Sequence, residues 1–229
     1  MWSELLKKLK NRKVGEKALV LRHRSDLHLT RKMFHTTGGI SFLFGFLVLG
    51  YPREVMAAII GIVLAIVMSI EYARMRWEWV NGLTLSVFGS VLRDTEVKQL
   101  SGIPFYMASC LFSFLIFPRH VTVLSILYLA FGDPSSSFFG VLWGRNRLFP
   151  NKSLQGTLGG FFVCAAATLF YLHYIGVEYD KLAVMVLIGG FAGAVAELLP
   201  LNIDDNFAIP VVSGAIMYLA FYLAELPLT

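Results

Sequence analysis

The chain has 229 residues, of which 56% are hydrophobic and only 15% charged, and its mean hydropathy is +0.66. A soluble domain of this size needs more polar surface to cover its core, and its helices carry a polar stripe that the long apolar blocks of this chain lack. The composition excludes an ordinary soluble protein. It predicts an all-α fold, a polytopic transmembrane helical bundle.

The net charge of +5 is unevenly distributed, because ten of the twenty Lys and Arg residues lie before residue 33. In so apolar a chain, this basic arm is better explained by contact with membrane lipids than by nucleic-acid binding. Its first apolar residues recur at helical spacing: Trp2, Leu5, Leu6 and Leu9. We therefore expect residues 1–32 to form a basic amphipathic arm on the membrane surface and residues 33–229 to form the transmembrane domain.

A membrane-spanning helix needs about 20 apolar residues. Segments of this kind lie at about 34–51, 54–73, 102–118, 120–140, 157–175, 181–199 and 208–225. A half-apolar stretch at 83–92 is expected either to lie at the interface or to re-enter the membrane. With a cytoplasmic N-terminus, 17 Lys and Arg residues fall on the cytoplasmic side and 3 on the other. The apolar segments predict about seven spanning helices, and the charge bias predicts a cytoplasmic N-terminus. From the compactness of the chain we expect a bacterial inner membrane.

Asp133 lies inside an apolar segment, where a carboxylate costs about 2.5–3.5 kcal/mol at mid-bilayer and usually faces a cavity or a partner. Gly132 and Pro134 flank it, so we expect the helix to break there and to expose backbone groups. Ser136 and Gly140 share a helical face with Asp133. A structural salt bridge of Asp133 is the alternative interpretation.

Further polar residues fall on the same predicted cytoplasmic face. Asp133, Asp204 and Asp205 offer the oxygen ligands that Mg²⁺ prefers. Cations suited to phosphate are Arg31, Lys32, Arg145 and Lys152, and glycines such as Gly156 allow a ligand to approach the backbone. Together these are the groups that phosphoryl transfer requires. Each also has a simpler explanation: positive-inside charge, helix packing between Gly140 and Gly144, an ion pair of Glu71 with Arg74, or a helix cap at 204–206.

Several motifs occur in a characteristic order: RKMFH at 31–35, Arg93 and Glu96 followed by SGI at 101–103, GDPSSSFFG at 132–140, NKSLQGTLGG at 151–160 and AELLPLNIDDNFAIPV at 196–211. In these motifs the chain resembles the CTP-dependent lipid kinases, which comprise dolichol kinase, phytol kinase and the yeast-type diacylglycerol kinase and are distantly related to phosphatidate cytidylyltransferase. It is most similar to the diacylglycerol kinase branch. It departs from the family at two places. Residues 134–136 are Pro-Ser-Ser where the family often has alanines, and residue 155 is glutamine where the family often has glutamate.

The resemblance implies transfer of the γ-phosphate of CTP, with Mg²⁺, to a lipid alcohol in the membrane, with diacylglycerol as the expected acceptor and phosphatidate as the product. The implied catalytic residues are Asp133, Lys152 and His35. The implied metal ligands are Asp133, Asp204 and Asp205, and the implied CTP-binding residues are Arg31, Lys32, Arg145, Ser153, Gly156 and Asn206. The alternatives are a polyprenol or phytol acceptor, a cytidylyltransferase, and a transporter, which the one-sided placement of the carboxylates disfavours.

Overall fold

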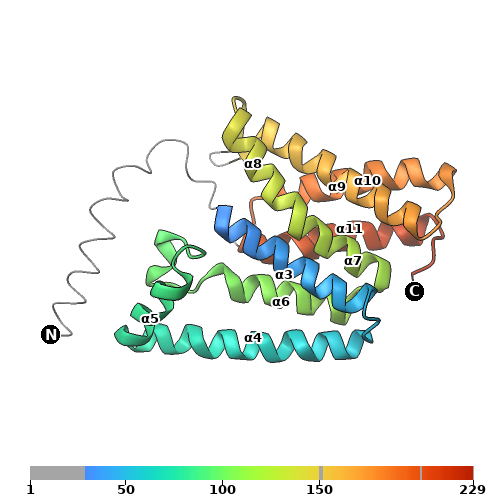
Figure 1. Ribbon diagram of the computed structural model, residues 1–229. Coiled ribbons are helices and arrows are strands. Elements are labelled where there is room, and N and C mark those ends of the chain that lie inside the picture. Colours follow the sequence, from blue (N-terminus) through green and yellow to red (C-terminus); the bar gives the residue numbers. More distant parts are fainter. Residues whose placement is uncertain (1–28, 150–151, 202, 229) are drawn as a thin grey trace.

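The computed structural model describes residues 29–149, 152–201 and 203–228, and these residues are mostly helical (Figure 1). The expected amphipathic helix of the N-terminal arm lies outside the described residues. Residues 29–32 of that arm already belong to the first described helix, α3 (Leu29–Leu47).

Each of the seven apolar segments forms a helix or a continuous helical run. Besides α3 these are α4 (Arg53–Arg76), α6 (Gly102–Ile116), the run α7–η2–α8 (Arg119–Leu127, Tyr128–Gly132 and Asp133–Trp143), α9 (Leu154–Tyr174), α10 (Tyr179–Leu198) and α11 (Asp205–Leu223). The half-apolar stretch forms α5 (Glu78–Phe88), and the 3-10 turn η1 (Asp94–Val97) follows it. Two short antiparallel strands, β1 (Arg147–Phe149) and β2 (Lys152–Ser153), precede α9. The all-α membrane bundle is confirmed.

The number of helices that could span a membrane on length and composition alone differs from the expected seven. Within the described part of the chain, α4, α9, α10 and α11 meet that criterion. Helix α6 has only 15 residues, and the run from α7 to α8 is divided at η2. Helix α3 has polar side chains in its first two turns, which lowers its hydropathy.

The helices pack around a core in which α9 lies between α8 and α10, and α11 lies against α10, α6 and α7 (Figure 1). Helix α4 packs against α6 at the edge of the bundle, and most of its surface remains exposed. Helices α8 and α9 approach closely through glycine: a Cβ added at Gly156 would lie 3.1 Å from the Cα of Gly140. Of the alternatives considered above, helix packing by Gly140 is therefore confirmed.

The expected helix break at Pro134 takes the form of a π-helical turn, η2, so the chain stays helical through it. Pro134 has no N–H to donate to the carbonyl of Ala130, as an α-helix would require. The Thr36 hydroxyl in α3 donates to that carbonyl instead, at 2.6 Å. The amide of Asp133 reaches back to the carbonyl of Tyr128, five residues earlier. Asp133 is thereby placed at the start of α8, directly after a distortion of a kind that is frequent at functional sites.

Replacing Thr36 with valine should destabilise the protein by about 1–3 kcal/mol, because the carbonyl of Ala130 would lose its partner in a buried region. The matched control is Thr37→Val, since the neighbouring Thr37 is exposed. Thermal unfolding in detergent, followed by tryptophan fluorescence, measures both variants. Equal unfolding temperatures for the two variants would contradict this role of Thr36.

Candidate active site

Lys152 lies in β2 at one end of the bundle and forms ion pairs with two carboxylates. Its Nζ is 2.8 Å from Oε1 of Glu197, near the end of α10, and 3.1 Å from Oδ2 of Asp205, at the start of α11. The chain reverses between these helices, and β2 leads directly into α9. The ammonium group of Lys152 therefore lies where α9 and α11 begin and where α10 ends.

Lys32 and Asp133 complete this group of charges. Nζ of Lys32 lies 3.4 Å from the carbonyl oxygen of Pro134, and Asp133 interacts electrostatically with both lysines and with Asp205. Glu197 interacts with Asp133 and Asp205 as well as with Lys152. These residues form the Lys152 cluster: Lys32, Asp133, Lys152, Glu197 and Asp205. Three carboxylates and two ammonium groups are thus gathered from five elements: α3, α8, β2, α10 and α11.

The charge of Lys152 is supported by its surroundings. Partial burial works against the ammonium form, but the charges of Glu197 and Asp205 and their hydrogen bonds outweigh it, so the pKa of Lys152 lies above its ordinary value. Lys152 therefore remains a cation at neutral pH.

Arg31 lies in a second, neighbouring group that is tied down by Glu96. Nη1 of Arg31 donates to both carboxylate oxygens of Glu96, at 2.8 and 3.0 Å, and the amide of Gly102 donates to the same carboxylate at 3.1 Å. Burial alone would raise the pKa of Glu96, but the hydrogen bonds from Arg31 and the Arg93 backbone, with the charges of both arginines, lower it. A Cβ at Gly102 would overlap both Arg31 Nη2 and Asn206 Nδ2, so a larger residue there would displace these two side-chain ends.

His35 is one helical turn from Arg31 and is buried beside Tyr106. The two rings lie 4.6 Å apart, and the Tyr106 hydroxyl donates to the backbone carbonyl of His35 at 2.6 Å. The side chain of Asn206 interacts with that of His35. We call Arg31, His35, Glu96 and Asn206 the Arg31 cluster.

Several buried polar atoms in and near the two clusters lack a hydrogen-bond partner among the described residues: Arg31 Nη2, His35 Nε2, Thr157 Oγ1 and Glu197 Oε2. Buried polar groups in proteins are nearly always paired with protein, water or a bound molecule. Such a concentration of unpaired donors and acceptors at one end of the bundle is typical of a site that binds a polar ligand.

Other residues expected at the site have structural contacts instead. The Ser153 hydroxyl accepts from the amide of Gly156 at 3.2 Å and caps α9, while Gly156 itself packs against α8. Asp204 caps α11 and accepts from Asn206 Nδ2 at 2.6 Å. Arg145 is exposed, and its backbone amide donates to Gln155 at 3.0 Å. The structure brings Asp133, Lys152, Lys32 and Asp205 together, but not Arg145 or Asp204.

Glu197 and Glu96 were not among the expected site residues, although both lie in polar groups of the sequence. The signal that points to Asp133, a carboxylate inside an apolar segment, also applies to Glu197, which lies in the apolar segment 181–199. For Glu96 it was the spacing from Arg93, whose amide donates to the Glu96 carboxylate at 2.9 Å. The ion pair of Glu71 with Arg74, expected as a simpler explanation for these two residues, is present at 2.6 Å. Glu71 also accepts a hydrogen bond from the Ser101 amide at 3.0 Å.

No group of three or more His, Cys, Asp or Glu side chains within the described ranges could by itself hold a metal ion. The carboxylates of Asp133, Glu197 and Asp205 nevertheless supply the oxygen donors that Mg²⁺ takes, and Glu197 Oε2 is buried and unpaired. Mg²⁺ is commonly bound by one or two carboxylates together with substrate phosphates. These residues therefore fit a metal ion that arrives with a nucleotide, and a preformed metal cage is absent from this part of the chain.

Replacing Glu96 with glutamine should lower the unfolding temperature, because it leaves the charge of Arg31 buried without its partner; such losses cost about 3–5 kcal/mol. The pKa of Glu96 is lowered in the folded state, so its stabilising effect is complete above the ordinary value of 4.5 and is lost as the pH falls through the lower, folded value.

The difference in unfolding temperature between the wild type and Glu96→Gln should therefore be constant at neutral pH and shrink below about pH 4.5. Glu78→Gln is the control, since Glu78 is exposed in α5. A difference that does not change between pH 7 and pH 3 would contradict the ion pair as its cause.

Comparison with known proteins was made by family models, by solved structures and by curated sequences. No family model and no solved structure matches the chain. CTP-dependent diacylglycerol kinase 1 of Schizosaccharomyces pombe is 31% identical over 204 residues, which are 83% of this chain and 92% of the relative. The protein of that name in Saccharomyces cerevisiae is 26% identical, over 82% of this chain and 72% of its own.

An uncharacterised protein of Rickettsia prowazekii is 25% identical over 81% of this chain and 91% of its own length. The match to the S. pombe kinase extends over nearly the whole of that relative and over most of this chain. The chain belongs to the family of CTP-dependent diacylglycerol kinases.

Proposed function

We propose that this protein transfers the γ-phosphate of CTP to diacylglycerol and forms phosphatidate. The observation that carries the proposal is the Lys152 cluster, in which two ammonium groups and three carboxylates meet at one end of a membrane bundle. Family membership supplies the donor and the acceptor, since the S. pombe and S. cerevisiae relatives are named for CTP and diacylglycerol.

Phosphoryl transfer depends mainly on positioning and on neutralising the charge of the phosphate oxygens. Lys152 and Lys32 would provide that neutralisation at the γ-phosphate. Glu197 and Asp205 would hold Mg²⁺, whose charge offsets that of the phosphate oxygens. In the Arg31 cluster, the unpaired Nη2 of Arg31 and Nε2 of His35 point to binding of the remaining phosphates of CTP.

Asp133 is best placed to act on the lipid, because it lies in the interior of the continuous α7–η2–α8 run, whereas Glu197 and Asp205 lie at the ends of their helices. In the proposed step the acceptor hydroxyl attacks the γ-phosphorus and its proton passes to the Asp133 carboxylate. The bond from the γ-phosphorus to the bridging oxygen breaks, and CDP leaves. Atoms and charges balance without any further reactant.

The proposed orientation places the polar clusters on the cytoplasmic side, where CTP is available. The distribution of 17 Lys and Arg residues against 3 supports a cytoplasmic N-terminus. The basic residues on that face would also raise the local concentration of a nucleotide anion. The location we propose is a bacterial inner membrane, and the bacterial relative is consistent with it.

The test is to incubate the purified protein in detergent with Mg²⁺, diacylglycerol and CTP labelled at either the γ- or the α-phosphate. The proposal predicts that the γ-label alone enters the lipid. Transfer of the α-label to phosphatidate would identify a cytidylyltransferase instead. Faster transfer to a polyprenol than to diacylglycerol would change the acceptor, and no transfer to any lipid would overturn the proposal.

Asp133→Asn and Lys152→Ala should each reduce transfer of the γ-label by about 100-fold or more, since each removes a group that acts in the transition state. The matched controls are Asp180→Asn and Lys98→Ala, which change exposed residues outside both clusters. Their rates should stay within about twofold of the wild type. Rates near the wild type for Asp133→Asn or Lys152→Ala would exclude those residues from the chemistry.

A further inference from the structure

Glu71 and Arg74 form a buried ion pair at the end of α4 that the proposed chemistry does not use. Their Oε2 and Nη2 atoms are 2.6 Å apart, and the two residues are only 4% and 2% exposed. Most of α4, by contrast, is exposed, and Tyr72 between them is 71% exposed. Apolar side chains of the same volume often stabilise a fold as well as a buried ion pair does. The pair therefore needs an explanation other than stability.

The hydrogen bonds of this pair lead to the segment between η1 and α6. Nη1 of Arg74 donates to the backbone carbonyl of Glu96 at 3.0 Å, and Nη2 donates to that of Gln99 at 2.6 Å. The carboxylate of Glu71 accepts from the amide and the hydroxyl of Ser101, at 3.0 and 2.9 Å. Residues 98–101 form no helix or strand, so these four hydrogen bonds from α4 hold the segment in place.

Glu96 begins this segment, and its side chain orients Arg31. Both carboxylate oxygens of Glu96 accept from Nη1 of Arg31, at 2.8 and 3.0 Å. Nη2 of Arg31 is buried and has no hydrogen-bond partner in the described part of the chain. Because a guanidinium group is planar and rigid, a displacement of Glu96 would also turn Nη2 away from its present direction.

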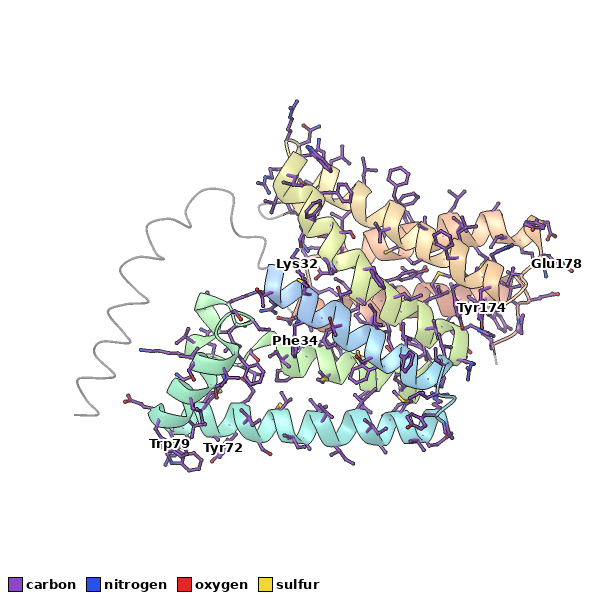
Figure 2. The ribbon with its side chains drawn as sticks, viewed as in Figure 1. Lys32, Phe34, Tyr72, Trp79, Tyr174 and Glu178 are labelled. Carbon is purple, nitrogen blue, oxygen red and sulfur yellow. The ribbon has the colours of Figure 1, made fainter. Side chains whose placement is uncertain are left out.

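The ion pair acts at the end of the bundle that carries the polar clusters. Tyr72 and Lys32, which adjoin Glu71 and Arg31 in the chain, lie toward the same end, whereas Tyr174 lies at the opposite end (Figure 2). All three side-chain nitrogens of Arg74 and both carboxylate oxygens of Glu71 already have partners within the protein. The pair therefore influences a ligand through the segment that it holds.

We propose that Glu71 and Arg74 are positioning residues, which hold Glu96, and through it Arg31, in the orientation that binds CTP. This inference rests on the proposed function and adds to it two residues that act without touching the nucleotide. An arginine is needed at position 74 because its fork reaches two carbonyls and a carboxylate at once, whereas lysine has a single ammonium group. Loss of the fork should weaken CTP binding and leave the chemical step at Asp133 and Lys152 intact.

Arg74→Lys should raise the KM for CTP about 10-fold, with kcat changed less than threefold. The Kd of a non-hydrolysable CTP analogue, measured by calorimetry without lipid, should rise by a similar factor. Glu71→Gln should shift both constants in the same direction, since it weakens the hold on Ser101. Arg76→Lys makes the matched change at an exposed arginine of the same helix end and should alter neither constant. Wild-type KM and Kd in both Arg74→Lys and Glu71→Gln would overturn the proposal.

A double-variant cycle shows whether Arg74 acts through Arg31. Arg31→Lys removes the oriented guanidinium group, so adding Arg74→Lys to it should raise the KM for CTP less than twofold further. Two effects that multiply in full would mean that the residues act independently, and would contradict the proposed route.

A stability control separates positioning from general destabilisation. The Thr122 hydroxyl donates to the carbonyls of Ser113 and Phe117, near the start of α7, and lies outside both polar clusters. Thr122→Val should therefore lower the unfolding temperature and leave the KM for CTP unchanged. An equal rise of that KM in Thr122→Val and Arg74→Lys would overturn the positioning role.

Failure of the inference can be distinguished from failure of the proposed function. If the wild type neither binds the CTP analogue nor transfers the γ-label, both are overturned. If the wild type does both and Arg74→Lys and Glu71→Gln behave like it, only the positioning role is wrong.

Discussion

The ammonium group of Lys152 makes the rest of this site possible. Carboxylates at the ends of apolar helices are costly to keep charged unless a cation compensates them. Lys152 lies between Glu197 and Asp205 at 2.8 and 3.1 Å and so holds the ends of α10 and α11 beside the start of α9. A nucleotide phosphate entering this site would compete with these carboxylates for the same ammonium group. Positive charge is therefore already in place before the substrate binds.

The second constraint is the proline after the buried carboxylate. Pro134 leaves the carbonyl of Ala130 without its helical donor, and the Thr36 hydroxyl satisfies it from α3. The π-helical turn that results sets the start of α8, and close glycine contacts fix α8 against α9. Asp133 is thus positioned by backbone geometry rather than by a side-chain clamp.

The sequence was sufficient to predict the helices, because long apolar blocks have few other stable forms in a membrane. It also predicted that Asp133, Lys152 and Asp205 would face one side. It could not predict which polar residues form the cluster, since this depends on how helices far apart in the chain pack. Asp204, next to Asp205, caps a helix, whereas Glu197 reaches Lys152 from another element. The charge and the motif of Arg145 predict a phosphate contact, but its side chain lies exposed, away from the Lys152 cluster.

The most direct test of the central claim is an electron cryo-microscopy structure with Mg²⁺ and a non-hydrolysable CTP analogue. The account predicts the terminal phosphate against Lys152 and Lys32, beside Asp133, with the other phosphates near Arg31 and His35. A nucleotide bound instead at the exposed strand around Arg147, with the ion pairs of Lys152 unchanged and no ligand beside Asp133, would contradict it.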